Sequence, residues 1–247
     1  MAAGVNVWLG TTSTEPAGAN DATNWSKGTP EAGDTLRFDG TAVKACAGGT
    51  IAAQVASITI TDDYSLALGT SIAAPLMMGC AGPVVDKGTG TAFLSIANTT
   101  SWFVTNTGTR SLNGLDNTAI TIDASSAVVV LGPNVATAAE FGQVTVIDGD
   151  VTILKVEAVA GSGAAPNVTQ IGGTLEVWDA VSDCKVSGGT YRQLLVGINN
   201  LTVDNATVQY SSSTKIDGTA TLDNNAVLDV SGSSSLTIDA CTMQPTS

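Results

Sequence analysis

The sequence contains no histidine and few basic residues. It has 9 Lys and Arg against 22 Asp and Glu among 247 residues, which gives a formal net charge of -13. Without histidine, the chain lacks the commonest general base, the usual zinc ligand and the central residue of a Ser-His-Asp triad. The negative charge has the wrong sign for contacts with phosphates. We therefore expect neither nucleic-acid binding nor histidine-based hydrolysis.

Long hydrophobic runs and aromatic residues are also scarce. The composition is 43% hydrophobic, 13% charged and only 4% aromatic. Polar residues and glycines interrupt every apolar run before it reaches the roughly 18 residues that a membrane span needs. Residues 1–8 have neither the basic nor the apolar segment of a secretory signal peptide. We expect a protein that does not enter a membrane and that stays in the cell where it is made, or leaves it by lysis.

The few cysteines point away from metal and redox chemistry. Cys46, Cys80, Cys184 and Cys241 are far apart in the sequence and form no CxxC pair, which argues against a zinc knuckle or a redox motif. We interpret them as buried free thiols. The spacing of the cysteines alone is also compatible with a disulfide.

The residues that are abundant indicate an all-β chain. Helix formers such as Lys, Glu, Gln, Arg and Leu are scarce, whereas Thr, Val and Ile dominate, with Gly and Asn between the runs. Apolar and small polar residues alternate over short segments, which predicts strands with one buried and one wet face. The clearest segments are 58–61, 119–123, 144–148, 151–154, 174–178 and 201–204.

Similar segments recur toward the C-terminus and favour a parallel β-helix, or β-solenoid. Their starts at Cys184, Leu201, Thr221 and Leu236 are spaced by about 15 to 20 residues, the length of one coil. Second strands lie between them, at 208–210 and 227–230, and Asn, Asp and Gly suit the corners. An antiparallel β-sandwich or jelly roll is the alternative, because hairpin-type pairs occur at Asn113-Gly114, Asp148-Gly149 and Asp217-Gly218.

The chain divides into four predicted parts. Residues 1–50 form an N-terminal cap and attachment segment, and residues 51–157 form a β-rich part, with solenoid coils expected. Residues 158–167 are small and uncharged, which is typical of a loop or joint, and residues 168–247 form the C-terminal coils. A short helix is expected from Thr137, within 131–141.

The N-terminal segment combines tryptophans with closely spaced turn residues. Trp8 is followed by Asn24-Trp25-Ser26, Gly28, Pro30, Gly33-Asp34 and Phe38. This W…NWS.G..P..GD…F pattern resembles the opening that precedes β-helical repeats in autotransporter-like surface proteins and in some bacteriophage virion proteins. A solenoid has an open apolar end, and Trp8, Trp25 and Phe38 are our candidate residues to cap it and to make assembly contacts.

The resemblance, together with the missing export signals, implies a virion protein. We find no C-terminal segment of the kind that forms an outer-membrane barrel in the secreted relatives. Virions assemble in the bacterial cytoplasm and leave by lysis, so a bacteriophage structural protein fits. Virion β-solenoids usually associate about a threefold axis, which implies a homotrimer that contacts the major capsid protein and other virion subunits.

The acidic residues were weighed as catalytic or metal-binding groups. Pairs occur at Asp62/Asp63, Asp148/Asp150, Asp179/Asp183 and Asp217/Asp223. A glycosidase needs two carboxylates facing each other across a bond, one of them with a raised pKa. Most of these residues are predicted at corners beside Asn or Gly, where a capped turn explains them. The ligand spacing of known calcium loops is missing, so we predict no catalytic residue, no metal and no cofactor.

These inferences lead to three functional hypotheses. The favoured one is a non-enzymatic capsid decoration or cement protein that reinforces a phage shell, located in the virion. The second is a glycan- or receptor-binding tail fibre or tailspike component. The third is a polysaccharide-degrading β-helix enzyme, which needs one of the carboxylate pairs in a cleft.

Overall fold

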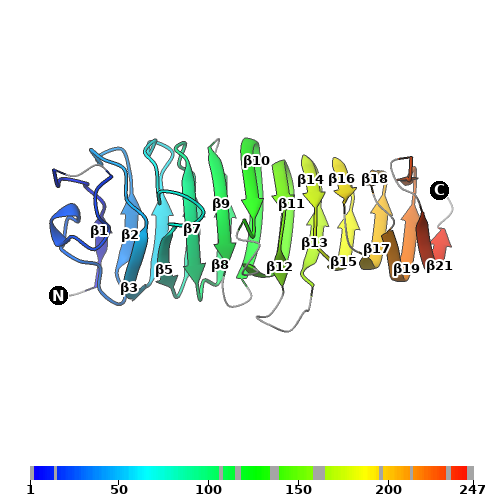
Figure 1. Cartoon of the computed structure of the whole chain (residues 1–247), viewed down its shortest axis with the longest axis horizontal. Helices are drawn as coiled ribbons and strands as arrows, with labels where there is room; N and C mark the ends of the chain where they lie inside the picture. The colour runs from blue at the N-terminus through cyan, green and yellow to red at the C-terminus, as the bar shows by residue number, and fades with distance from the viewer. Residues whose placement is uncertain are drawn as a thin grey trace.

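The computed structural model shows an elongated parallel β-solenoid with the two termini at opposite ends (Figure 1). It describes residues 3–13, 16–105, 108–114, 118–133, 139–157, 165–194, 197–211, 214–231 and 235–243. All pairings between the named strands are parallel and join them into one 21-stranded sheet. The all-β solenoid prediction is therefore confirmed, and the sandwich and jelly-roll alternative is wrong, because those folds are built from antiparallel pairs.

The strands stack in two main ladders. Ladder A contains β1 (Val5–Val7), β2 (Thr35–Phe38), β4 (Ser57–Ile60), β6 (Pro83–Asp86), β8 (Ser101–Val104), β10 (Thr118–Leu131), β11 (Ala139–Ile153), β13 (Asn167–Gln170), β15 (Val181–Val186), β17 (Ile198–Asp204), β19 (Thr214–Asp223) and β21 (Leu236–Met243). Ladder B contains β3 (Gly49–Val55), β5 (Leu76–Cys80), β7 (Ala92–Ala97), β9 (Thr109–Gly114), the second halves of β10 and β11, β14 (Thr174–Val177), β16 (Thr190–Gln193), β18 (Thr207–Tyr210) and β20 (Val227–Asp229).

Two short elements complete the description. The strand β12 (Val156–Glu157) pairs with the start of β11. The 3-10 helix η1 (Ala22–Asn24) begins after Asp21, whose side chain accepts a hydrogen bond from the Thr23 N–H. Within the described residues, no helix is long and apolar enough to cross a membrane.

The core is a set of side-chain columns that run along the solenoid. Alternation along each strand directs every second residue inward, and the parallel register places these residues above one another. One column of ladder A joins Leu36, Ile58, Val84, Trp102, Ile120, Val144, Val168, Cys184, Leu201 and Ala220. All of these residues are buried. This narrow apolar interior explains why so few aromatic residues suffice.

Corners between strands use left-handed backbone, as predicted. Asn205 and Asn224 adopt positive φ angles of 49° and 50° after strands β17 and β19. Gly189 has a φ of 74°, and a Cβ there would lie 2.3 Å from the carbonyl oxygen of Gly173 in the next coil. Only glycine fits that corner, because both the dihedral angle and the close stacking exclude a side chain.

The three hairpin-type pairs are not hairpins. Asn113-Gly114 ends β9, and the other two pairs lie inside the long strands β11 and β19, which continue around corners. Gly149 has a φ of 123° where β11 turns from ladder A to ladder B. Gly149 and Gly218 lie where the register shifts between faces of one coil, so these two pairs do not support the antiparallel alternative.

The predicted parts form one continuous stack. β11 pairs with both β13 and β14, so the ladders run from the upstream to the downstream part without a break. Residues 158–164 of the predicted joint lie outside the described residues, as do residues 134–138 of the predicted helix. The flanks of that predicted helix, Leu131 and Phe141, belong to β10 and β11.

Candidate functional site

The three aromatic residues singled out in the sequence meet at the N-terminal end. The ring centroids of Trp8 and Trp25 are 5.1 Å apart, and Trp25 lies 5.6 Å from Phe38, both in edge-to-face geometry. Tyr64 extends the cluster, 5.7 Å from Phe38. The indole N–H groups donate to backbone carbonyls of Lys44 and Ala19, at 3.0 and 2.8 Å. The cluster therefore closes the end of the core from inside.

All three candidate residues are buried, with at most 3% of the side chain of Trp25 exposed. The three rings lie together at the N-terminal end of the core. Their capping role and a direct contact with another protein stay predictions.

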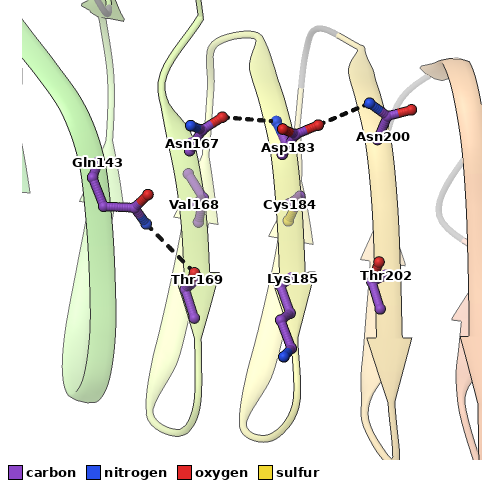
Figure 2. Close-up of a pocket in the computed structure, with 9 residues that line it drawn as sticks. All are labelled: Gln143, Asn167, Val168, Thr169, Asp183, Cys184, Lys185, Asn200 and Thr202. Atoms are coloured by element: carbon purple, nitrogen blue, oxygen red, sulfur yellow. Dashed lines mark hydrogen bonds between the residues drawn. The ribbon is translucent and has the colours of Figure 1, made fainter.

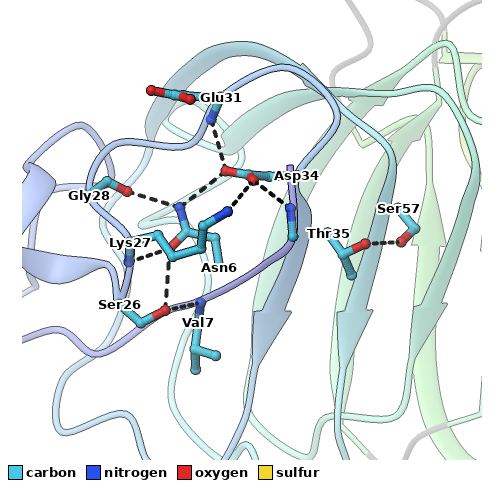
Figure 3. A network of polar contacts seen from close by, with 10 residues as sticks. Asn6, Val7, Ser26, Lys27, Gly28, Glu31, Asp34, Thr35 and Ser57 are labelled. Atoms are coloured by element: carbon cyan, nitrogen blue, oxygen red, sulfur yellow. Dashed lines mark hydrogen bonds and ion pairs between the residues drawn. The ribbon is translucent and has the colours of Figure 1, made fainter. Parts of the chain in front are cut away.

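A network of polar contacts surrounds the buried carboxylate of Asp34 beside the aromatic cluster (Figure 3). Asp34 Oδ1 accepts from the Gly4 N–H at 3.2 Å and pairs with Lys27 Nζ at 2.9 Å. Its Oδ2 accepts from the Glu31 N–H at 3.1 Å and from Asn6 Nδ2 at 3.4 Å. One carboxylate thus joins the start of the chain, at Gly4 and Asn6, to Lys27 and Glu31 just before β2.

Asn6 and Ser26 cover the outer edge of β1 in the same network. Asn6, buried in the strand, donates to the Gly28 carbonyl at 2.9 Å and accepts from the Lys27 N–H at 3.0 Å. The Val7 N–H donates to Ser26 Oγ, and the Ser26 N–H donates to the Val7 carbonyl, both at 2.9 Å. Backbone groups that would otherwise form an open sheet edge are therefore bonded within the chain.

The network also sets the ionisation of Asp34. Burial raises the pKa of this carboxyl, but the hydrogen bonds from Lys27 and from the backbone of Glu31 and Gly4 outweigh it, and the pKa lies below its ordinary value. A lowered pKa means that the ionised form stabilises the cap.

The carboxylate pairs proposed from the sequence bond locally. Asp148 accepts from the Gly149 N–H and Asp179 from the Ala180 N–H, each at 2.8 Å. Asp217 pairs with Lys215 at 2.6 Å on the exposed surface. Within the described residues, no group of three or more His, Cys, Asp or Glu side chains could hold a metal ion. Asp148 and Asp179 thus accept from the backbone N–H that follows them, whereas Asp217 forms an ion pair within its own strand.

A polar row crosses the outer surface of ladder A and lines a shallow groove (Figure 2). The Asn167 side chain accepts from the Asp183 N–H at 3.3 Å, and Asp183 accepts from Asn200 Nδ2 at 2.8 Å. Asn200 in turn accepts from the Thr219 N–H at 3.1 Å. Each bond joins one coil to the next, so the row ties successive coils together on the outside.

The aromatic residues outside the cap are mostly internal. Trp102, Tyr191 and Tyr210 are buried, whereas Trp178 is 40% exposed and Phe103 is 42% exposed. The two exposed rings lie on different ladders, since Trp178 follows β14 and Phe103 lies in β8. They do not form the joined aromatic platform that a glycan groove usually presents.

The core also contains an ion pair that no sequence pattern predicted. Arg110 Nε and Nη2 contact the two carboxylate oxygens of Asp86 at 2.6 and 2.9 Å, and both side chains are almost fully buried. The guanidinium donates further to the carbonyls of Gly88 and Gly90. The fork of Arg thus satisfies corner carbonyls inside the solenoid. In the sequence, the only indication of this ion pair is an Asp at an inward-facing position of a strand.

The cysteines are free thiols. Cys46, Cys80 and Cys184 are buried and Cys241 is exposed. Burial raises the pKa of the Cys184 thiol to about 12, against a smaller opposing effect of Tyr191. Burial also raises the pKa of Cys46 and of Cys80. The buried-thiol interpretation is confirmed for three residues and is wrong for Cys241, because the strand that carries it is the last described strand of its ladder.

The C-terminal end of the solenoid differs from the N-terminal end. Among the described strands, β21 pairs with β19 alone. Cys241 and Met243 continue the inward columns of Ala220 and Leu222, yet Cys241 is exposed and Met243 is 77% exposed.

Comparison of the chain with family models, curated proteins and solved structures found no match.

Proposed function

We propose that this chain is a non-enzymatic structural protein of a bacteriophage virion, a decoration or cement protein that reinforces the shell. The observation that carries the proposal is the uninterrupted parallel stack from β1 to β21, sealed at one end by the aromatic cluster and the Asp34 network. A rod of this kind is stiff along its axis, because each coil is bonded to the next through both ladders.

The distribution of polar groups supports a structural role. The paired carboxylates bond to adjacent backbone or to neighbouring coils, as Asp148, Asp179 and Asp183 do. Several polar side chains that line the groove on ladder A already bond to a neighbouring coil, as Gln143, Asn167 and Asn200 do. The proposal therefore assigns no catalysis, no metal and no cofactor to the chain. Its partners are the major capsid protein and other virion subunits, and the homotrimer implied by the resemblance stays part of the proposal.

A glycan- or receptor-binding fibre is the second candidate. The observation in its favour is the polar row of Gln143, Asn167, Asp183 and Asn200, whose amide and carboxylate groups are of the kind that bind sugar hydroxyls. The exposed Trp178 offers one stacking surface. A polysaccharide-degrading enzyme is the third, and Asp→Asn substitutions in the carboxylate pairs would have to abolish activity to support it.

Copy number and rebinding test the proposal. Particles that carry this protein are analysed by quantitative mass spectrometry, and purified protein is added to particles made without it. A shell protein predicts hundreds of copies and saturable rebinding that protects the particles against heat. A few to tens of copies, or rebinding only to tails, would support the fibre instead. Folded protein that binds neither would contradict both.

A further inference from the structure

Three side chains of the network around Asp34 form an arrangement with a chemistry of its own. The Asp34 carboxylate accepts from Lys27 Nζ on Oδ1 at 2.9 Å and from Asn6 Nδ2 on Oδ2 at 3.4 Å. Figure 3 shows the Lys27 and Asn6 side chains converging on this one carboxylate. An amine, a carboxamide and a carboxylate that contacts both are the groups needed to exchange one amide nitrogen for another.

The three groups are largely shielded from water. The side chain of Asp34 is 4% exposed and that of Lys27 is 28% exposed, and Asn6 is fully buried. The buried indoles of Trp8 and Trp25 follow Asn6 and precede Lys27 by two residues each. Burial disfavours both charges of the ion pair, so transient transfer of one proton from Lys27 to Asp34 costs less than in water. The neutral lysine amine formed in this way is a nucleophile.

The carbonyl group of Asn6 is polarised by separate donors. Asn6 Oδ1 accepts from the Lys27 backbone N–H at 3.0 Å and from Ser26 Oγ at 3.4 Å. Donors on this oxygen stabilise the negative charge that develops there when a nucleophile attacks Cγ, as in an oxyanion hole. The nitrogen Nδ2 is held instead by Asp34 and by the Gly28 carbonyl, at 2.9 Å from the latter. The developing oxyanion and the leaving nitrogen therefore each have their own partners.

We propose that Lys27 and Asn6 join in an intramolecular isopeptide bond, with Asp34 as the proton carrier. Asp34 takes one proton from the Lys27 ammonium, and the neutral amine attacks Asn6 Cγ. Asp34 passes that proton to Nδ2, the Cγ–Nδ2 bond breaks, and ammonia leaves. A second proton from the lysine nitrogen passes through Asp34 to the ammonia, which departs as ammonium. The exchange is redox-neutral and needs no co-reactant, and the chain loses one NH3, about 17 Da.

The bond closes a covalent loop over residues 6–27. It joins β1 to the segment after Trp25, so both indoles of the aromatic cluster lie within the loop. Closing a loop lowers the conformational entropy of the unfolded chain, as a disulfide does, but reduction does not open this one. Asp34 keeps the N–H donors of Gly4 and Glu31 after the bond forms. The bond goes beyond the proposed function and does not depend on it.

Intact mass spectrometry of the denatured full chain tests the bond, with Lys27→Arg as the variant without a nucleophile. Arg keeps a positive charge beside Asp34, but its guanidinium stays protonated and does not attack an amide. Lys44→Arg is the matched control, because the Lys44 carbonyl accepts from the Trp8 indole and its Nζ donates to the Thr12 carbonyl.

The expected mass is about 17 Da below that of the sequence for the unmodified protein and for Lys44→Arg, and equal to that of the sequence for Lys27→Arg. The full sequence mass in the unmodified protein, or the same deficit in Lys27→Arg, overturns the proposal. Neither outcome depends on whether the protein binds to shells.

Digestion with trypsin distinguishes the isopeptide bond from a succinimide at Asn6, which loses the same mass. Trypsin cuts after an unmodified lysine, so a chain without the bond gives fragments 1–27 and 28–37. A joined Lys27 is not cut, and residues 1–37 should appear as one fragment that is lighter by about 17 Da and carries a link between Asn6 and Lys27. Two separate fragments, with the deficit in 1–27, overturn the proposal.

The substitution Asp34→Asn tests the proton carrier. Asn has the same shape but does not accept a proton from Lys27, so the bond should form about a hundredfold more slowly during cell-free synthesis. Tryptophan emission matching that of the unmodified chain shows that Trp8 and Trp25 stay packed in the variant. An unchanged rate in a variant with this emission overturns the role of Asp34. The mass and digestion tests of the unmodified protein stand independently of this variant.

Discussion

The N-terminal and C-terminal ends of the solenoid both carry an end strand, but they differ in how the side chains around that strand are covered. At the N-terminal end, Val7 and Asn6 of β1 bond to Ser26 and Lys27, and Trp8 fills the core beneath the strand. At the C-terminal end, Cys241 and Met243 occupy inward columns and remain exposed. Sealing the N-terminal end takes a dedicated segment, residues 8–34, between β1 and β2. The inward columns are therefore covered at this end and exposed at the last described strand.

The two ends should differ most when one side chain of an inward column is truncated at each. Trp8→Ala removes a fully buried indole from the cap and should lower the free energy of unfolding by about 3–5 kcal/mol. Met243→Ala removes an exposed side chain and should change it by less than about 0.5 kcal/mol. Chemical denaturation of dilute protein measures both. Comparable losses at the two ends would mean that they are packed alike.

The Asp34 network should contribute the next largest effect. Asp34→Ala leaves Lys27 and the N–H groups of Gly4 and Glu31 without their acceptor, and we expect a loss of about 2–3 kcal/mol. The substitution Asp239→Ala at the other end removes a solvent-exposed partner of Lys215 and should have little effect. Thermal unfolding of the two variants checks the difference.

The same carboxylate predicts an acid-sensitive cap. Because the folded pKa of Asp34 is lowered, its stabilisation is complete above the unfolded pKa of 3.8 and is lost as pH falls through the lower folded value. Stability measured against pH should therefore fall on acidification, and Asp34→Asn should flatten the curve in that window. An unchanged slope in Asp34→Asn would show that other carboxyls cause the acid sensitivity.

Thiol labelling should show the smallest difference between the two ends, and it reports on single residues. Cys46, Cys80 and Cys184 are buried, and the pKa of Cys184 is raised to about 12, so these thiols should react only after unfolding. Cys241 is exposed and should react rapidly in the folded protein. A fast reaction of two or more thiols in the folded state would contradict the burial of the columns.

Alternation and repeats were sufficient to predict the parallel solenoid, because each strand buries one face whatever its neighbours are. The register of the last coils could not be obtained in this way. The sequence suggested that Thr221 and Leu236 begin repeats equivalent to Leu201, whereas Leu201 pairs with Ala220, and Ala220 with Cys241. Coils lengthen toward this end, and β19 and β21 continue around a corner, so similar letters fall on different faces.

The site residues show the same limit. The meeting of Trp8, Trp25 and Phe38 at one end followed from the resemblance, but their full burial did not. The pair of Asp86 and Arg110 joins residues 24 positions apart and depends on the stacking of coils. The exposure of Cys241 and Met243 likewise depends on which strands lie beside β21, and composition and spacing do not give that information.

Hydrogen exchange of the two end strands tests the central claim most directly. Amides of β1 and β2 should exchange slowly, because the cap lies over them and their bonds lie within one chain. Amides of β21 should exchange faster, because Cys241 and Met243 in its inward columns are exposed. Equal protection of β1 and β21 would contradict the account of a sealed N-terminal end and an exposed last described strand.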